Sequence, residues 1–169
     1  MKTISEEYRQ LNAQMLDECE HYATSGHQNA QAIQGLMRER PDIATVLDYG
    51  CGRQTLQKAL PAIPITPYDP AIPEYAEAPM PHDLVACTDV LEHIEPEYLD
   101  NVLKDLRRVT KKVGYFVICT VAARKLLPDG TNPHRIVEGS RFWLTKLLEA
   151  NFEPLFMQRS STHLILLVT

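Results

Sequence analysis

Two glycines and two carboxylates stand where a nucleotide-like ligand could bind. The run Asp48-Tyr49-Gly50-Cys51-Gly52 ends a short β-rich segment and precedes a segment of helical composition, residues 53–60. Glycine in such a turn lets the backbone approach a ligand closely, because it has no Cβ. Asp69 ends the next strand candidate, where a carboxylate can accept hydrogen bonds from both hydroxyls of a ribose. Any turn can contain two glycines, but the strand–turn–helix context and the second acid favour a ligand site.

Four further side chains could move a proton or hold a metal ion. Asp89, Glu92 and His93 are spaced i, i+3, i+4, which predicts one shared face if this segment is helical. His134 lies in a long predicted loop, residues 122–139. Histidine suits general-base work at neutral pH, which a hydroxyl acceptor needs. A packing or helix-capping role for His93, and an ordinary surface position for His134, are the alternatives.

The predicted elements would bring these residues to one edge of a sheet. Helical spacing recurs in two segments before Pro41 and again over residues 96–110 and 140–150. Short β-rich or apolar runs, and a predicted closing hairpin, occupy residues 44–48, 63–69, 83–88, 115–121, 153–158 and 162–169. Strands that alternate with helices predict an α/β fold with a mostly parallel sheet and helices on both faces. Ligands bind such sheets at the carboxyl ends of the strands.

The glycine turn matches neither of two common nucleotide motifs. A dinucleotide fingerprint would need a third glycine where Thr55 stands, and the Lys and Ser/Thr of a phosphate-binding loop are missing. The turn instead resembles motif I of the class I S-adenosylmethionine (SAM)-dependent methyltransferases, and Tyr68-Asp69 resembles their ribose-binding acid. Residues 83–94, DLVACTDVLEHI, are similar to the "DLV…DVLEH" segment of the subgroup that includes ubiquinone-biosynthesis O-methyltransferases. The C-terminal run LLEANF resembles the subgroup's last helix and "GF" ending, with Asn151 in place of glycine.

The resemblance implies a Rossmann-like three-layer fold and a set of cofactor contacts. Gly50 and Gly52 would pass under the methionine part of SAM, and Asp48 would face its amino group. Asp69 would hold the ribose, while Thr88 and Asp89 would line the methionine side. The same resemblance places three neighbouring residues in the cofactor site, namely Tyr49, Cys51 and Pro70.

Two departures from the family pattern predict a reduced sheet. Gln54 stands where the pattern usually has a third glycine, so the following helix is expected slightly further out. Only residues 70–82 separate Asp69 from Asp83, which leaves no room for the family's usual helix and third strand. The segment with Pro64 and Pro67 then becomes an edge strand, where proline is tolerated. The loop carrying Ile72 and Tyr75 is expected to cover the adenine.

The sequence constrains the acceptor site less than it constrains the cofactor site. The resemblance makes His93 and His134 the candidate catalytic residues. Four cations near His134 could bind a carboxylate or phosphate of the acceptor, namely Arg124, Lys125, Arg135 and Arg141. For each of them a solvated surface position is the more common alternative. Together with His134, the Asp89/Glu92/His93 group also resembles the divalent-metal site of small-RNA 2′-O-methyltransferases. The same "LEH" run occurs in relatives with no known metal, so the prediction is a site without one. The four cysteines are predicted to be reduced and to serve as small buried apolar residues.

Composition excludes several classes of protein. With 169 residues, of which 44% are hydrophobic and 23% charged, the chain predicts one globular domain: a helical cap over residues 1–43 and a SAM-binding core over residues 44–169. A net charge of −5 argues against binding long duplex nucleic acid. No apolar run is long enough for a membrane span and the start does not resemble a signal peptide, so a cytoplasmic location is expected.

The predicted function is therefore methyl transfer from SAM to a small or terminal acceptor, with a hydroxyl as the preferred group. The alternative is a SAM-binding accessory or regulatory protein that transfers nothing. A nicotinamide-dependent oxidoreductase is disfavoured, because the third glycine and a substrate domain are absent. Because a reduced core leaves the acceptor open, a second subunit could complete it.

Overall fold

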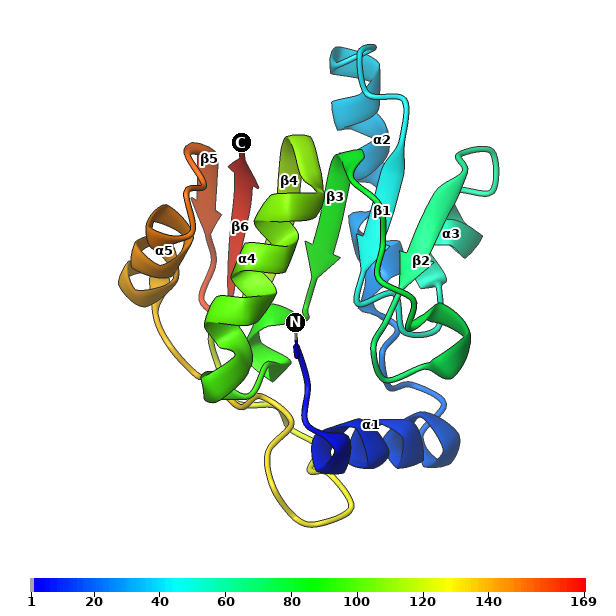
Figure 1. Ribbon diagram of the computed structural model, residues 1–169, viewed down its shortest axis with the longest axis vertical. Coiled ribbons are helices and arrows are strands. Elements are labelled where there is room, and N and C mark those ends of the chain that lie inside the picture. Colours follow the sequence, from blue (N-terminus) through cyan, green and yellow to red (C-terminus); the bar gives the residue numbers. More distant parts are fainter. Residues whose placement is uncertain (1) are drawn as a thin grey trace.

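A six-stranded mixed sheet forms the centre of the molecule (Figure 1). The computed structural model describes residues 2–169. The strand order is β2-β1-β3-β4-β6-β5. The first four strands are parallel, and β6 is antiparallel to both β4 and β5. The bounds are β1 Val46–Tyr49, β2 Ile65–Tyr68, β3 His82–Thr88, β4 Thr110–Cys119, β5 Pro154–Arg159 and β6 His163–Val168.

Helices cover both faces of the sheet, as the alternation of elements predicts. Helices α4 (Leu99–Val109) and α5 (Ser140–Glu149) pack on one face, and α2 (Ala30–Glu39) and α3 (Thr55–Ala59) on the other (Figure 1). Alternate side chains of the central strands enter the two cores, since successive residues of a strand point to opposite faces. Helix α1 (Glu6–Glu18) lies across the edge of the sheet where the parallel strands end (Figure 1).

The reduced sheet and the closing hairpin are confirmed. Strand β2 pairs only with β1 and forms one edge of the sheet. Pro67 therefore lies in an edge strand, where its missing N–H breaks no ladder on the outer side. The short connection from β2 to β3 contains a single 3-10 turn, Pro73–Tyr75, in place of a helix and a strand. At the other edge, β5 and β6 form the predicted antiparallel hairpin.

Three predicted elements are corrected. The helix predicted over residues 53–60 is only α3, and the helix predicted from Pro96 begins as a 3-10 turn, Pro96–Tyr98, before α4. The strand predicted over residues 115–121 is β4, which starts directly at Thr110, so Lys111, Lys112 and Gly114, residue types that suit a helix end, lie in the strand. Gly114 lies within β4, where an added Cβ would come within 2.7 Å of the Phe116 ring. This glycine is therefore explained by tight packing in the sheet and does not mark a helix end.

No helix within residues 2–169 is both long and apolar enough to cross a bilayer.

The C-terminal end of α5 is a Schellman motif in which Asn151 takes the usual place of glycine. The Phe152 N–H bonds to the Leu147 carbonyl at 3.0 Å and the Asn151 N–H to the Leu148 carbonyl at 3.0 Å. Asn151 has φ 63°, a left-handed conformation that glycine adopts without a steric penalty and asparagine tolerates better than other residues.

We expect Asn151→Ala to lower the free energy of unfolding by about 1 kcal/mol, because alanine is strained at this φ. Asn151→Gly should equal the wild type or exceed it slightly. Urea unfolding of the three proteins measures both effects. An alanine variant as stable as the glycine variant would show that the left-handed conformation carries no strain.

Candidate functional site

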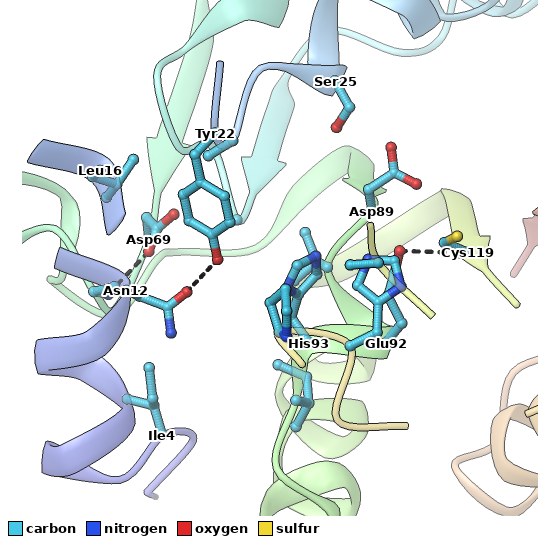
Figure 2. A pocket seen from close by; sticks show the side chains of 18 of the residues that line it. Ile4, Asn12, Leu16, Tyr22, Ser25, Asp69, Asp89, Glu92, His93 and Cys119 are labelled. Carbon is cyan, nitrogen blue, oxygen red and sulfur yellow. Dashed lines mark hydrogen bonds between the residues drawn. The ribbon is translucent and has the colours of Figure 1, made fainter. Parts of the chain in front are cut away.

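A cavity of about 390 Å³ opens at the carboxyl ends of β1, β3 and β4, under α1 (Figure 2). Seven of the predicted site residues line it: Tyr49, Gly50, Asp69, Pro70, Asp89, His93 and His134. Gly52 lines a neighbouring hollow with Ile72 and Tyr75, which share that hollow and not the main cavity. Asp48, Cys51 and Thr88 are buried and line neither. The structure thus brings most of the predicted site to one place.

Close packing against neighbouring residues requires glycine at positions 50 and 52. Gly50 has φ 81° and Gly52 has φ 46°. An added Cβ would lie 2.4 Å from a Val90 methyl at residue 50, and 2.6 Å from the Ala23 Cβ at residue 52. Gln54 also has a left-handed φ of 55°, a conformation that glycine adopts without strain, and α3 begins at the next residue. The turn is therefore held between the β3 end and the N-terminal segment.

Asp69 ties the glycine turn to the loop after β2. Its Oδ2 accepts a hydrogen bond from the Gly52 N–H at 3.1 Å, and its Oδ1 accepts one from the Ala71 N–H at 2.9 Å. Burial raises the pKa of the Asp69 carboxyl, against the effect of these two amides. Burial, and secondarily the Asp69 charge, raises the pKa of Asp48 to about 7. A buried and a half-buried carboxyl whose charges interact favour a cationic ligand, which would stabilise their charged forms.

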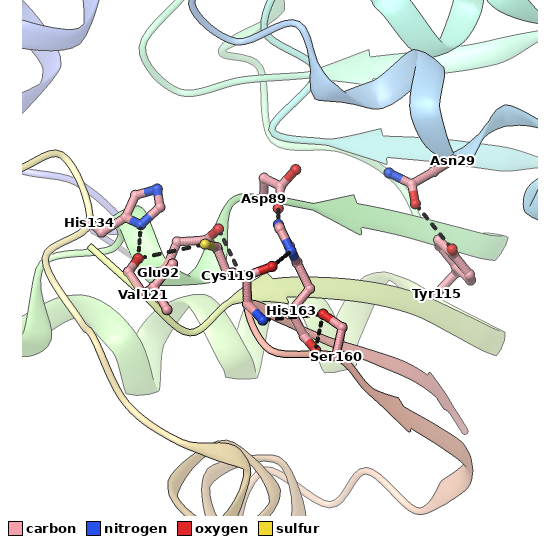
Figure 3. A network of polar contacts seen from close by, with 10 residues as sticks. Asn29, Asp89, Glu92, Tyr115, Cys119, Val121, His134, Ser160 and His163 are labelled. Carbon is pink, nitrogen blue, oxygen red and sulfur yellow. Dashed lines mark hydrogen bonds and ion pairs between the residues drawn. The ribbon is translucent and has the colours of Figure 1, made fainter. Parts of the chain in front are cut away.

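Asp89 faces a histidine that the sequence analysis did not single out. His163 Nε2 lies 3.4 Å from Asp89 Oδ1, and Thr162 Oγ1 lies 2.8 Å from His163 Nδ1 (Figure 3). Asp89 has φ 54°, and its buried Oδ1 has no hydrogen-bond partner within residues 2–169. Strained backbone and orphaned polar atoms of this kind concentrate at functional sites. His163 arrives here because β6 runs antiparallel, so its first residue pairs with Cys119 at the carboxyl end of β4.

The segment after β3 places two histidines and a buried glutamate together. Residues 91–93 form a 3-10 turn, so the prediction that Asp89, Glu92 and His93 share one helical face is wrong. Glu92 Oε1 accepts a hydrogen bond from the Cys119 N–H at 3.0 Å (Figure 3), while Oε2 is buried and unpartnered among the described residues. The His93 and His134 rings meet edge to face, with centroids 4.7 Å apart.

The two imidazoles differ in their surroundings. His134 Nδ1 lies 2.6 Å from the Val121 carbonyl oxygen (Figure 3), and since a carbonyl only accepts, Nδ1 carries the proton and Nε2 has the free lone pair. His93 Nδ1 is buried without a partner among residues 2–169. Burial, and secondarily the His134 charge, lowers the pKa of His93 to about 3, so His93 is neutral near pH 7.

The four-residue metal hypothesis does not match the geometry. Within residues 2–169, the group whose ligand atoms lie within 4.8 Å of one another is Glu92, Cys119 and His134. Asp89 and His93 are outside that group. Cys119 enters it because β4 ends beside the 3-10 turn, a juxtaposition with no signal in the sequence.

Helix α1 closes the cavity through contacts to two loops. Tyr8 donates its hydroxyl hydrogen to the Pro133 carbonyl at 2.9 Å, and Tyr22 donates to Asn12 Oδ1 at 2.6 Å (Figure 2). Arg53, next to the glycine turn, donates to the Tyr22 and Cys19 carbonyls at 3.1 and 3.0 Å and also to the Leu16 carbonyl. These bonds fasten the C-terminal end of α1 to the turn.

The predicted cations and cysteines are only partly where they were expected. Of the four cations, Lys125 lines the cavity, whereas Arg124, Arg135 and Arg141 do not. Arg135 instead stacks 5.3 Å from the centre of the Tyr8 ring. Cys51, Cys87 and Cys119 are buried, as predicted, but Cys19 is half-exposed and its Sγ lies 3.1 Å from Lys125 Nζ.

The pH dependence of stability should report on Glu92. Burial raises its pKa well above the usual range, so the folded protein binds this proton more tightly than the unfolded chain does. Stability should therefore fall as the pH rises above the unfolded value of about 4.3, by up to about 1.4 kcal/mol per pH unit.

We expect Glu92→Gln to remove this loss. The gain in unfolding free energy over the wild type should be larger at pH 8 than at pH 5 in urea titrations. An equal difference at both pH values would mean that Glu92 is charged in the folded protein.

Comparison with known proteins agrees with this geometry. The model of a methyltransferase domain family matches residues 19–154. No curated protein matches the chain in sequence. A structure of 1,6-didemethyltoxoflavin-N1-methyltransferase from Burkholderia thailandensis, with S-adenosylhomocysteine, aligns with a TM-score of 0.70 at 17% identity, covering 99% of this chain and 91% of that one. Magnesium protoporphyrin IX methyltransferase from Synechocystis PCC 6803, with SAM, aligns at 0.67 and 12%, covering 99% of each chain.

A third solved structure, a complex of DhpI with S-adenosylhomocysteine, aligns with a TM-score of 0.62 at 16% identity and covers 96% of this chain and 93% of that one. At these identities the three structures show the fold, while the family model covers most of the sequence. The chain belongs to the methyltransferase domain family and is a class I SAM-dependent methyltransferase with a reduced sheet.

Proposed function

We propose that the protein methylates a hydroxyl group of a small molecule, or of the exposed end of a larger one. The observation that carries this proposal is the pair His93 and His134, whose rings meet 4.7 Å apart in the cavity that also contains Asp69 and Asp89. A hydroxyl must lose its proton to become a strong nucleophile, and an imidazole is the side chain that accepts it near neutral pH. The likeness of residues 83–94 to the ubiquinone-type O-methyltransferases supports the same acceptor group.

The residues present fit SAM. Two buried polar atoms, Glu92 Oε2 and His93 Nδ1, have no hydrogen-bond partner within residues 2–169, and both residues line the cavity. We assign Asp69 to the ribose, and Asp48, Thr88 and Asp89 to the methionine end, along the turn Tyr49–Gly52 and Pro70. When bound, SAM supplies a methyl group on a positively charged sulfur. The carboxylates of Asp69 and Asp89 complement that charge and the cofactor's ammonium group.

His134 is the residue we assign to the proton. Its Nδ1–H is anchored on the Val121 carbonyl, which orients the ring. Nε2 would then accept the proton of the acceptor hydroxyl, whose oxygen would take the methyl group that bound SAM supplies, with S-adenosylhomocysteine as the leaving group. His93 is held neutral by burial and packs against the edge of this ring, so we assign it to orienting the acceptor and excluding water.

The N-terminal segment, residues 2–43, completes the acceptor pocket in this proposal. Tyr8, Asn12 and Tyr22 line the cavity from α1 and the turn after it. Because these side chains cover the site, an acceptor that enters must be small or must present a narrow terminal group. Alignment of acceptor and methyl group inside such a closed pocket can supply several kcal/mol of the barrier.

The test is a matched panel of acceptors. Small compounds that carry a hydroxyl, an amine or a carboxylate on one scaffold are incubated with the protein and SAM, and methylated products are measured by mass. We expect methylation of hydroxyl compounds only. SAM binding by calorimetry with product from the amine or carboxylate alone would overturn the hydroxyl assignment. Binding without any product across the panel would favour the non-catalytic alternative.

A further inference from the structure

Three potential metal ligands from distant parts of the chain meet at the cavity. Glu92, Cys119 and His134 each offer one ligand atom, and these atoms all lie within 4.8 Å of one another; Figure 3 shows the three side chains together. All three residues line the cavity. Asp89 and His93, which their spacing in the sequence made candidate ligands, lie outside the group. The set that the fold assembles therefore includes a thiol and differs from the set that the sequence suggested.

A buried carboxylate oxygen without a partner indicates that this group holds a ligand. Glu92 is 0% exposed. Its Oε1 accepts the Cys119 N–H at 3.0 Å, whereas Oε2 has no hydrogen-bond partner within residues 2–169. Removing a carboxylate oxygen from water without a partner is unfavourable, and a bound cation offsets this loss. None of the cofactor contacts assigned above uses the Glu92 carboxylate, so Oε2 is available to a metal ion.

Hydrogen bonds around the group orient its three ligands. His134 Nδ1 lies 2.6 Å from the Val121 carbonyl oxygen, so Nε2 carries the free lone pair. Cys119 Sγ lies 3.6 Å from the same carbonyl oxygen, and the Cys119 N–H fixes the Glu92 carboxylate. Histidines that bind a metal through one nitrogen usually donate the other N–H to a carbonyl or a carboxylate. The contacts that orient metal ligands in proteins are therefore already present.

The chemistry of the three donors favours zinc among the divalent ions. Mg²⁺, Ca²⁺ and Mn²⁺ prefer oxygen ligands, whereas Zn²⁺ binds thiolate sulfur, imidazole nitrogen and carboxylate oxygen. Tetrahedral bonds of about 2.0–2.3 Å place ligand atoms about 3.5 Å apart, a spacing that small side-chain rotations can reach. The negative charges of Glu92 and Cys119 would balance the charge of the ion. With three protein ligands, the fourth position is left for water, as in zinc sites with an open position.

We propose that Glu92, Cys119 and His134 bind one Zn²⁺ ion, and that this ion reversibly stops methyl transfer. His134 Nε2 is the atom that we assign to accepting the proton of the acceptor, and a zinc ion bound there occupies the same lone pair. The protein without zinc is then the active form, and zinc acts as an inhibitor. The inhibition rests on the proposed function, whereas the zinc site rests only on the three ligands.

Titration with Zn²⁺ in the absence of SAM tests the site. Calorimetry in competition with a chelator of known affinity is expected to show one tightly bound zinc ion per chain. Cys119→Ser and His134→Gln each remove a ligand and should raise the dissociation constant for Zn²⁺ at least about 100-fold, since changes outside the ligand set already weaken metal sites about 10–100-fold.

Two matched variants control for other thiols and imidazoles. Cys19→Ser changes a half-exposed thiol, and His82→Gln changes an imidazole at the start of β3, so both should bind zinc as the wild type does. Circular dichroism confirms that each variant is folded. With Co²⁺ as a probe, the wild type should show a sulfur-to-cobalt charge-transfer band that Cys119→Ala lacks. A wild type that binds no zinc, or binding that Cys119→Ser and His134→Gln leave unchanged, would overturn the proposal.

Methylation assays test the effect of the ion. With a hydroxyl acceptor, saturating zinc should lower the rate at least about 100-fold, the lower end of what a general base contributes, and EDTA should restore it. Cys119→Ala should keep its own rate when the same zinc concentration is added. An undiminished rate in the zinc-saturated wild type would overturn the inhibition. If the zinc-free protein methylates no hydroxyl compound, the proposed function fails, while the binding measurements still decide the zinc site.

Discussion

Replacing Asp69 by alanine is expected to weaken SAM binding about 100-fold, the largest effect of any single change at the cofactor end of the site. The Asp69 carboxylate holds the N–H groups of Gly52 and Ala71 and is the group we assign to the ribose hydroxyls. Alanine removes the acceptor for the ribose and leaves two amides unpaired, so geometry and contact are lost together. Isothermal titration with SAM measures the change in dissociation constant.

Asp69→Asn separates the contact with the ribose from the hydrogen bonds that hold the turn. Asparagine keeps one oxygen for one of the amides but lacks the charge, so an intermediate loss of about tenfold is expected. Asp100→Ala is the matched control, because this carboxylate pairs with Lys146 outside the cavity. Unchanged affinity in Asp69→Ala would remove this residue from the cofactor site.

Replacing His134 by glutamine is expected to lower kcat by about 10²–10⁴-fold, the range that positioned general bases contribute. Glutamine can keep a hydrogen bond to the Val121 carbonyl but cannot accept the acceptor's proton. The dissociation constant of SAM should change little, since the assigned cofactor contacts lie on the β1, β2 and β3 ends. Single-turnover rates with a hydroxyl acceptor, beside titrations with SAM, distinguish the two effects.

His82→Gln provides the control for His134→Gln. His82 begins β3 at the opposite end of the strand and bonds to Thr66 and to the Met80 carbonyl, so this variant should keep the wild-type kcat. Full kcat in His134→Gln would show that His134 is not the group that accepts the proton.

The sheet and the glycine turn could be predicted from the sequence because both depend on local chemistry. Pro64 and Pro67 cannot donate to a ladder, which assigned the second strand to an edge before any tertiary contact was known. The short interval between Asp69 and Asp83 left no room for another helix and strand. Gly50 and Gly52 marked a turn with positive φ, although their immediate neighbours proved to be Val90 and Ala23.

Element boundaries were less predictable where two signals overlapped. Lys111, Lys112 and Gly114 suit the end of a helix, yet strand pairing with β3 and β6 draws these residues into β4. Asp89, Glu92 and His93 have helical spacing, but the left-handed Asp89 and the 3-10 turn after it separate their side chains. In both places long-range pairing outweighed the local preference of the residues.

The sequence by itself determined the class of fold and the carboxylates at the strand ends, because the periodicity of helices and strands is a local property of the chain. The reduced sheet could be predicted because the interval between Asp69 and Asp83 is shorter than in the methyltransferase family that the sequence resembles. Only the tertiary structure decided which distant residues share the cavity. His163 meets Asp89, and the Cys119 N–H meets Glu92, because the antiparallel β6 lies against β4 and both reach the same edge of the sheet. Tyr8 and Tyr22 enter the cavity because α1 folds across that edge. Such contacts join residues far apart in the chain, so no local pattern records them.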